Sequence, residues 1–375
     1  MTNQSPLIVG AGPVGISAAL FLAQAGISTR IIDVKQEPSH HSKALAVNPR
    51  TLALLEGSGI TESMLSVGLP IRGGRFWKDG IAVADMMFDA LPHKYPFMLA
   101  LSQATTERLL ERALQEAGGK IERGTELTWC ASRSGAVEAE LKHTRDDRHE
   151  TVRCPWLLAA DGAHSTTRQA TGVDFLGSSF PNSWHLADAP LQTQLDGTLA
   201  HVFFFETGFL FLIRVIDDAT SRSATPPLWR LISNDPTRLS KIPQSTIVGK
   251  PLWTSDFHIS HRMNTQLRVG NIYFAGDAAH IHSPIGARGM NLGIEDAWVF
   301  SELVRTRHLE RYDLLRKSVD GPIVKRIERM SRIVRGESLI ARVTRSVAAS
   351  LVTKVPALRH RVLAMITGLD HALGV

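Results

Sequence analysis

A glycine-rich turn near the start of the sequence constrains the fold more than any other feature. The apolar run 7–9 is followed by Gly10, Gly12 and Gly15, and then by an apolar segment typical of a buried helix. A second apolar run ends at Asp33. This order of strand, glycine turn, helix, strand and acid is typical of a dinucleotide-binding unit, in which glycines let the backbone approach a pyrophosphate and the acid accepts from a ribose hydroxyl. The pattern predicts an α/β fold of Rossmann type, without separating NAD from FAD.

The composition fits a globular enzyme in a reducing compartment. The chain has 375 residues, 43% hydrophobic and 21% charged, which excludes disordered, collagen-like and coiled-coil classes. The two cysteines, Cys130 and Cys154, are too few for a disulfide framework. A net charge of +6 hints at anionic ligands but gives no nucleic-acid signal. Residues 7–27 carry no charge, but their glycines argue against a membrane span and no secretory pattern precedes them, so we expect a cytoplasmic protein.

Two further turns end buried strands later in the sequence. One apolar run stops at Asp161-Gly162 and another at Gly276-Asp277. Between these turns helical periodicity fades and strand-like runs prevail, which indicates an inserted β-rich domain. The predicted segments are a first part of the dinucleotide-binding domain at 1–173, a β-rich substrate domain at 174–264, a second part of the dinucleotide-binding domain at 265–335, and a C-terminal helical segment at 336–375.

The three motifs together resemble the class A flavoprotein monooxygenases, the aromatic hydroxylase family typified by para-hydroxybenzoate hydroxylase. They read GAGPVG at 10–15, DGAHSTTR at 161–168 and GDAAHIHSPIGARGMNLGIEDA at 276–297. Their order and spacing make the resemblance specific, and it covers residues 5–335. It implies a Rossmann-type FAD-binding domain with an inserted β-rich substrate domain and C-terminal helices.

The resemblance implies a set of residues that hold FAD. They are Gly10, Gly12, Gly15, Asp33, Lys43, Arg50, Gln103, Asp161, Asp277, Gly289, Met290 and Asn291. Lys43 or Arg50 would bring positive charge near the nucleotide, although many relatives have an arginine where Lys43 stands. Gln103 matches a glutamine that relatives use on the ribityl or phosphate region. Asp161 is linked with both FAD and the nicotinamide cofactor, and Asp277 would accept from the flavin ribityl chain.

The last motif combines a thin loop with the start of a helix. Pro284 and the flanking glycines keep the loop rigid, and Gly289 begins a helix whose N–H groups would face the pyrimidine edge of the flavin. The resemblance puts Pro284, as a catalytic residue, beside the ring carbon that carries the peroxide, and Arg288 in the reaction zone. His280 and His282 also suggest a metal pair, but no carboxylate partner is evident nearby. The sequence therefore favours packed loop histidines and no metal.

The β-rich segment is expected to cover the substrate. Its candidate polar contacts and pocket-lining aromatics are His201, Arg214, Arg230, Phe203, Phe205, Phe209, Phe211 and Trp229. Strand alternation places Phe203 and Phe205 on one face with His201, a stripe that more often belongs to a core than to a ligand site. Arg214 stands out in an apolar strand, so it is a second catalytic candidate that would hold a substrate carboxylate or phenolate. A surface-edge arginine is the equal alternative.

The resemblance implies a monooxygenase that uses FAD, O2, and NADPH or NADH as a transient reductant. Through a flavin hydroperoxide it would hydroxylate a small phenolic or heteroaromatic molecule. The alternative is an FAD-dependent oxidoreductase of the same fold without hydroxylation, such as a lipid or isoprenoid double-bond reductase. The halogenase branch is disfavoured because its WxWxIP motif is absent. The basic stretch 305–361 leaves open a peripheral membrane or homodimer contact, with a helix packed on its own domain as the more common outcome.

Overall fold

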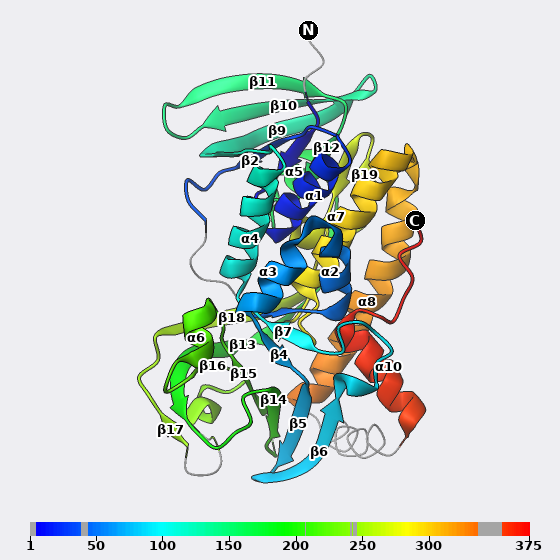
Figure 1. The fold of residues 1–375 in the computed structure, drawn as a ribbon. Helices are drawn as coiled ribbons and strands as arrows, with labels where there is room; N and C mark the ends of the chain where they lie inside the picture. The colour runs from blue at the N-terminus through cyan, green and yellow to red at the C-terminus, as the bar shows by residue number, and fades with distance from the viewer. Residues whose placement is uncertain (1–4, 39–43, 207, 241, 243–245, 337–354) are drawn as a thin grey trace.

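A six-stranded sheet carries the glycine turn at its centre (Figure 1). The computed structural model describes residues 5–38, 44–206, 208–240, 242, 246–336 and 355–375. The strand order is β19-β20-β12-β1-β2-β8, and every neighbouring pair except β19 with β20 is parallel. The strands are β1 Leu7–Val9, β2 Arg30–Asp33, β8 Ile121–Arg123, β12 Leu157–Ala159, β19 Arg268–Val269 and β20 Ile272–Phe274. The predicted α/β fold of Rossmann type is confirmed.

Helices and a small antiparallel sheet complete this half of the molecule. The helix α1, Pro13–Gln24, follows the glycine turn and contacts α4, Gln103–Glu116, and α7, Gly289–Thr306. The small sheet has the order β11-β10-β9 and shares the apolar core of the six-stranded sheet. Its strands, with the other short elements of this half, are β9 Thr125–Arg133, β10 Ala136–His143, β11 Arg148–Cys154, α2 Pro49–Leu54, α3 Ile60–Val67 and α5 Thr166–Thr171.

A nine-stranded sheet forms the other half. Its order is β21-β18-β13-β16-β15-β14-β5-β6, with β17 paired to β13. The strands are β5 Gly73–Lys78, β6 Ile81–Met87, β13 Phe175–Gln192, β14 Leu199–Phe204, β15 Phe209–Arg214, β16 Leu228–Ser233, β17 Ile247–Val248, β18 Trp253–Asn264 and β21 His280–Ile281. The segment 174–264 thus supplies most of the sheet, whereas β5 and β6 join it from the first part of the chain through the parallel pairing of β14 with β5.

The two faces of this sheet have different partners. Phe211 and Ile213 of β15 share an apolar cluster with Ala287, which lies in the loop before α7. Phe203 and Trp229 point to the opposite face and belong to a separate core. The interpretation of the stripe as core, favoured from the sequence, is therefore confirmed for Phe203 and Phe205, and Trp229 belongs to the same core. The face that carries Ile213 is the one turned toward the dinucleotide-binding half.

Two helices near the C-terminus run alongside both halves (Figure 1). The helix α8, Tyr312–Arg335, contacts α7 and β18. The helix α10, Pro356–Thr367, places Leu363 in the same apolar cluster as Ile213. The remaining elements are α6 Ala219–Ser223 and a three-stranded sheet of order β3-β7-β4, with β3 Ala46–Val47, β4 Leu69–Ile71 and β7 Met98–Ala100. Within the described ranges, no helix has the length and apolarity needed to cross a membrane.

Candidate active site

The glycine turn leaves one side of its backbone open. Gly10 has φ +99°, and a Cβ there would lie 2.3 Å from the carbonyl oxygen of Ala160. A Cβ at Gly15 would lie 1.9 Å from the carbonyl oxygen of Gly10. These two glycines are therefore required by the packing of the turn itself. A Cβ at Gly12 meets nothing within 4 Å, so the space beside the start of α1 is open to a bound group, and the backbone N–H groups there would suit an anion.

The carboxylate of Asp33 supports this turn. One oxygen, Oδ2, accepts from the backbone N–H of Ala11 at 2.7 Å, and the other accepts from the N–H of Lys35 at 2.8 Å. Asp33 therefore fixes the turn from the end of β2. Its predicted contact with an adenosine ribose stays a prediction.

The DG motif holds an acid with one unused oxygen. Asp161 follows β12, and its Oδ2 accepts from both the backbone N–H and the hydroxyl of Thr167. Its Oδ1 is buried and has no hydrogen-bond partner among the described residues. Arg168 of the same motif donates to the carbonyl of Ala278, which ties the DG motif to the GD turn. Because buried polar atoms are nearly always satisfied, Oδ1 of Asp161 indicates a donor from a bound group.

The three motifs meet around the start of α1. A Cβ added at Gly276 would lie 2.8 Å from Cγ2 of Val14, and a Cβ added at Gly293 would lie 2.5 Å from the same atom. The GD turn, η4 Gly276–Ala278, and the first turns of α7 therefore pack directly on the glycine turn. Asp277 is exposed although both its neighbours in this turn are buried. An open cradle, an unsatisfied acid and an exposed acid thus converge, which fits the phosphates and sugar chain of FAD.

The loop before α7 is held by a buried asparagine. The amide of Asn291 donates to the carbonyls of Ala46 and Ala287, and its oxygen accepts from the backbone N–H of Asn48. Asn291 therefore locks the loop and α7 to β3 and the start of α2. The helix begins at Gly289, as predicted. Met290 is partly buried against the main core.

Other predicted FAD residues have different surroundings. Gln103 opens α4 and donates its amide to the carboxylate of Glu107 at 2.7 Å. Lys43 lies outside the described residues. Arg50 lies at the start of α2 and donates to the carbonyls of Gly368 and His371 in the C-terminal segment. Its predicted place near the nucleotide stays a prediction.

Arg214 does not reach the site. Its guanidinium donates to the carbonyls of Ser221 and Arg222, at the end of α6. It pairs across the strands with Trp229, whose side chain belongs to the core on the far face of the sheet. Arg214 therefore lies on the opposite face from Ile213, and its predicted role in holding a substrate anion is corrected. Arg230, on the same face as Ile213, is a buried partner of Asp188 through two hydrogen bonds of 2.7 Å.

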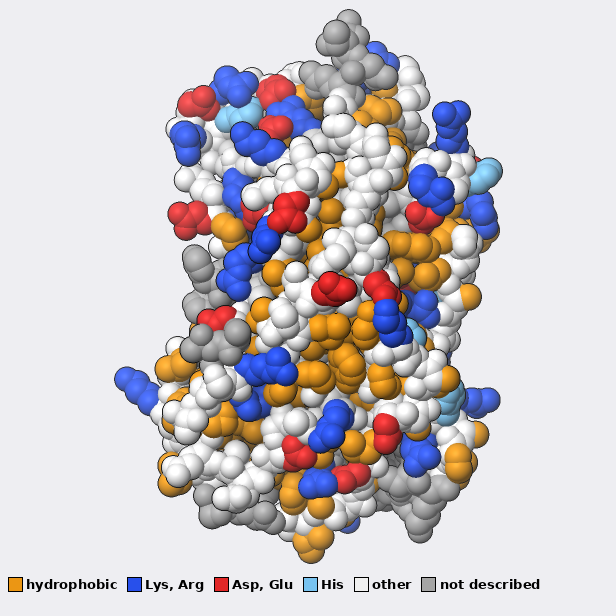
Figure 2. Space-filling view, in the orientation of Figure 1, with side chains coloured by type: hydrophobic (Ala, Val, Ile, Leu, Met, Phe, Trp, Pro, Cys, Tyr) orange, Lys and Arg blue, Asp and Glu red, His pale blue; other side chains and the backbone are white. Residues whose placement is uncertain are grey.

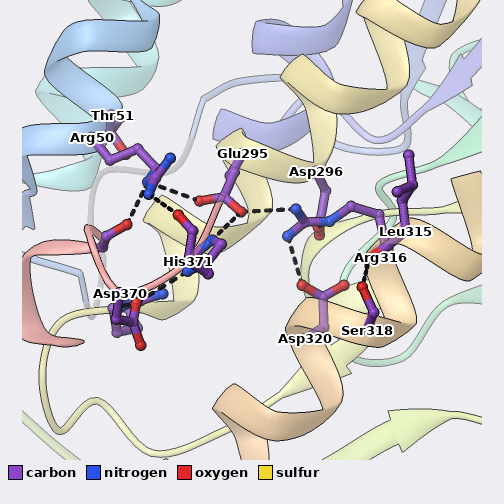
Figure 3. Close-up of polar contacts among 12 residues, drawn as sticks. Arg50, Thr51, Glu295, Asp296, Leu315, Arg316, Ser318, Asp320, Asp370 and His371 are labelled. Atoms are coloured by element: carbon purple, nitrogen blue, oxygen red, sulfur yellow. Dashed lines mark hydrogen bonds and ion pairs between the residues drawn. The ribbon is translucent and has the colours of Figure 1, made fainter. Parts of the chain in front are cut away.

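A cluster of buried charges lies behind the site and was missed in the sequence (Figure 3). Arg316, fully buried on α8, donates to Glu295, Asp296 and Asp320 at 2.8, 2.7 and 2.6 Å. Asp296 also accepts from the N–H of Gly276 and contacts His280 Nε2 at 2.8 Å. We call the five residues Glu295, Asp296, Arg316, Asp320 and His280 the charged cluster. It fixes the GD turn to α7 and α8.

The charged cluster corrects the expectation that His280 has no carboxylate partner. Burial by itself lowers the pKa of His280, but the charges of Asp296 and Asp320 outweigh it and raise the pKa to about 9. His280, Asp296 and Asp320 are also close enough to hold a metal ion. The guanidinium of Arg316 already bonds to both carboxylates, so a cation would have to displace it.

The raised pKa of His280 predicts a pH dependence of stability. Because the folded pKa lies above the ordinary value of 6.5, protonated His280 stabilises the fold fully below pH 6.5, and this contribution is lost as the pH rises through 9. The free energy of unfolding should fall by about 3 kcal/mol over this range. Urea unfolding of His280→Gln should show a flatter profile above pH 6.5. His308→Gln, at an exposed position, is the control, and an equally steep profile in His280→Gln would contradict the assignment.

Comparisons with known proteins agree with this geometry. The family model described as FAD binding domain matches residues 4–313. The chain is 32% identical to 6-methylpretetramide 4-monooxygenase of Streptomyces rimosus over 97% of this chain and 69% of that protein. It is 29% identical to pentachlorophenol 4-monooxygenase of Sphingobium chlorophenolicum, over 84% of this chain and 63% of that one. 

A solved structure shows the same fold. The p-nitrophenol 4-monooxygenase from Pseudomonas putida DLL-E4 superposes with a TM-score of 0.85 at 21% identity, covering 98% of both chains. The curated relatives are longer, since the chain spans from 60% to 69% of the lengths of the first three. The motifs, the fold and the matched family together show that the chain belongs to the FAD binding domain family, among the class A flavoprotein monooxygenases.

Proposed function

We propose that the protein is an FAD-dependent monooxygenase that uses NADPH or NADH and O2 to hydroxylate a small phenolic or heteroaromatic molecule. The observation that carries the proposal is the convergence of the glycine turn, the DG motif and the GD turn around an open cradle. Relatives named for pentachlorophenol and anhydrotetracycline support aromatic substrates. In this proposal Gly10, Gly12, Gly15, Asp33, Gln103, Asp161, Asp277, Gly289, Met290 and Asn291 surround FAD.

An apolar cluster beside the loop before α7 would supply the wall against which an aromatic ring lies. Phe211 and Ile213 from the sheet, Ala287 from the loop and Leu363 from α10 belong to one cluster. Figure 2 shows hydrophobic side chains gathered across the middle of the molecule, between the two large sheets. Such walls hold a ring by apolar contact and keep water away from the reacting atoms. On this face Arg230 and Asp188 are already paired with each other.

The loop before α7 would orient the reaction. Bound FAD would accept hydride from the nicotinamide cofactor and supply the oxygen chemistry. Pro284 lies in the loop that joins the GD turn to α7. It would set the distance between the flavin ring and the apolar cluster that contains Ile213 and Leu363. The N-terminal N–H groups of α7, which carry the positive end of the helix dipole, would stabilise negative charge that develops on the reduced ring. Arg288, the last residue before α7, would add a full positive charge there.

The reductant, the cellular compartment and a surface contact are also part of the proposed function. NADPH or NADH would act as a transient partner, in the cytoplasm. A shallow groove of about 440 Å³ on α8 is lined by Lys317, Lys325, Arg326 and Arg329, and it would serve a peripheral contact with an anionic surface or a second copy.

Anaerobic reduction tests the proposal. The purified protein, reconstituted with FAD, is mixed with NADPH or NADH, with and without each member of a panel of phenols and heteroaromatics, and flavin absorbance is followed. We expect reduction that accelerates sharply with one class of phenol. Bound flavin that neither nicotinamide reduces with any compound would contradict the proposal and favour the non-hydroxylating alternative.

A further inference from the structure

The last residues of the chain form a segment that returns to the active-site loop. The guanidinium of Arg288, only 2% exposed, donates through Nη1 to the carbonyl of Met365 and to Asp370 Oδ1, the latter at 3.0 Å. Arg50 donates to the carbonyls of Gly368 and His371. The segment 365–371, which we call the C-terminal strap, is therefore bound at two points close to the start of α7.

Asp370 is the central residue of the strap. Its Oδ1 contacts His371 Nδ1 at 3.0 Å, and its Oδ2 accepts from Arg326 of α8 at 2.6 Å. Burial alone would raise the pKa of Asp370, but hydrogen bonds from His371 and Arg288 hold the pKa well below its usual range. Asp370 is thus a carboxylate with an ionic partner on the loop and another on α8.

The strap is also joined to the charged cluster. His371 Nε2 lies 2.7 Å from Glu295 Oε1, an oxygen that also accepts from Arg316 (Figure 3). The start of α7, the loop and the strap therefore form one continuous set of hydrogen bonds. A rotation of Asp370 would be opposed from both sides, which fixes the orientation of Arg288.

Arg288 is satisfied on one side alone. Its Nε and Nη2 groups are buried and have no acceptor among the residues that the structure describes. A guanidinium presents five N–H donors in a fixed plane, so fixing Nη1 also fixes the direction of the other donors. Buried N–H groups without acceptors are costly, and this pair indicates an acceptor that belongs to a bound group.

We propose that Asp370 is a positioning residue for Arg288, and that the C-terminal strap completes the active site. Asp370 holds Nη1, so that Nε and Nη2 meet an electron-rich acceptor on the bound flavin. The inference rests on the proposed function, and it deepens that function because it assigns the orientation of a cation beside the flavin to a residue at the far end of the sequence. Arg288 contacts the bound group, whereas Asp370 acts through Arg288.

The test compares three single variants and one double variant of the FAD-reconstituted protein. Asp370→Asn keeps the shape of the side chain and removes the charge that holds Arg288. We expect it to slow anaerobic flavin reduction by on the order of ten- to a hundredfold and to move the flavin midpoint potential to a more negative value. Glu116→Gln makes the same type of change in an exposed ion pair, that of Glu116 with Arg112 on α4, and should keep the rate within about twofold of wild type.

Arg288→Met tests whether the two residues act together. This variant should shift the potential in the same direction, and adding Asp370→Asn to it should change neither rate nor potential further. Additive effects, or an Asp370→Asn potential equal to wild type, would overturn the proposal. If Asp370→Asn fails to fold, a wild-type potential in Arg288→Met would overturn it as well.

A failure of this inference can be distinguished from a failure of the proposed function. The midpoint potential and the absorption spectrum of the flavin are measured without an aromatic substrate. A protein that binds FAD but hydroxylates no phenol would still show the potential shift if the strap positions Arg288. A protein that binds no FAD would instead contradict the proposed function itself.

Discussion

Replacing Arg316 by methionine should lower the free energy of unfolding by about 3–5 kcal/mol, the cost of breaking a buried ion pair from one side. Arg316 is fully buried, and each of its three nitrogens donates to a different carboxylate. Methionine has a similar length but leaves Glu295, Asp296 and Asp320 buried without the guanidinium that bonds all three. Chemical denaturation at neutral pH, followed by circular dichroism, measures the loss.

The matched control for this experiment is Arg305→Gln. Arg305 makes an ion pair with Glu302 on α7, but its side chain is 53% exposed. Solvent screening limits such a pair to about 1 kcal/mol or less. If Arg316→Met cost no more than Arg305→Gln, the charged cluster would not be a structural centre of the fold.

Replacing Gly12 by valine should abolish FAD binding while leaving the fold intact. A side chain at this position meets no protein atom but fills the open side of the glycine turn. We expect FAD affinity to fall at least a hundredfold, because hydrogen bonds to a charged phosphate are worth about 1.5–3 kcal/mol each. Fluorescence titration of the apoprotein with FAD measures the affinity, and the melting temperature reports on folding.

Gly15→Val gives the contrast that makes this result interpretable. A Cβ at Gly15 would collide with the backbone of Gly10, so this variant should lose stability as well as FAD. A Gly12→Val protein that kept wild-type FAD affinity would show that the cradle is not the phosphate site. Equal loss of stability in both variants would show that Gly12 is needed for packing alone.

The local motifs were predictable because each depends on residues that are adjacent in the sequence. A glycine turn between two strands leaves few alternatives for Gly10 and Gly15, and the structure shows the backbone contacts that require them. The helix start at Gly289 was equally local. Such features depend on φ angles and close approach, which a short stretch of sequence determines.

The long-range contacts were not predictable in the same way. Asp296 and Arg316 lie on different helices, and a charge inside an apolar helix pattern does not reveal its partner. The signal that was present was the pair Glu295-Asp296 within an otherwise apolar segment. Strand alternation grouped Phe203 and Phe205 correctly, but which face of the sheet meets the flavin half depends on tertiary packing.

Isotope labelling shows directly whether this chain inserts oxygen into an aromatic substrate. The FAD-loaded protein is incubated with NADPH or NADH, ¹⁸O2 and the phenol that most accelerates flavin reduction, and the product is analysed by mass spectrometry. We predict that the product hydroxyl carries one labelled oxygen atom from ¹⁸O2. A product formed without label, or labelled from H2¹⁸O instead, would contradict the account.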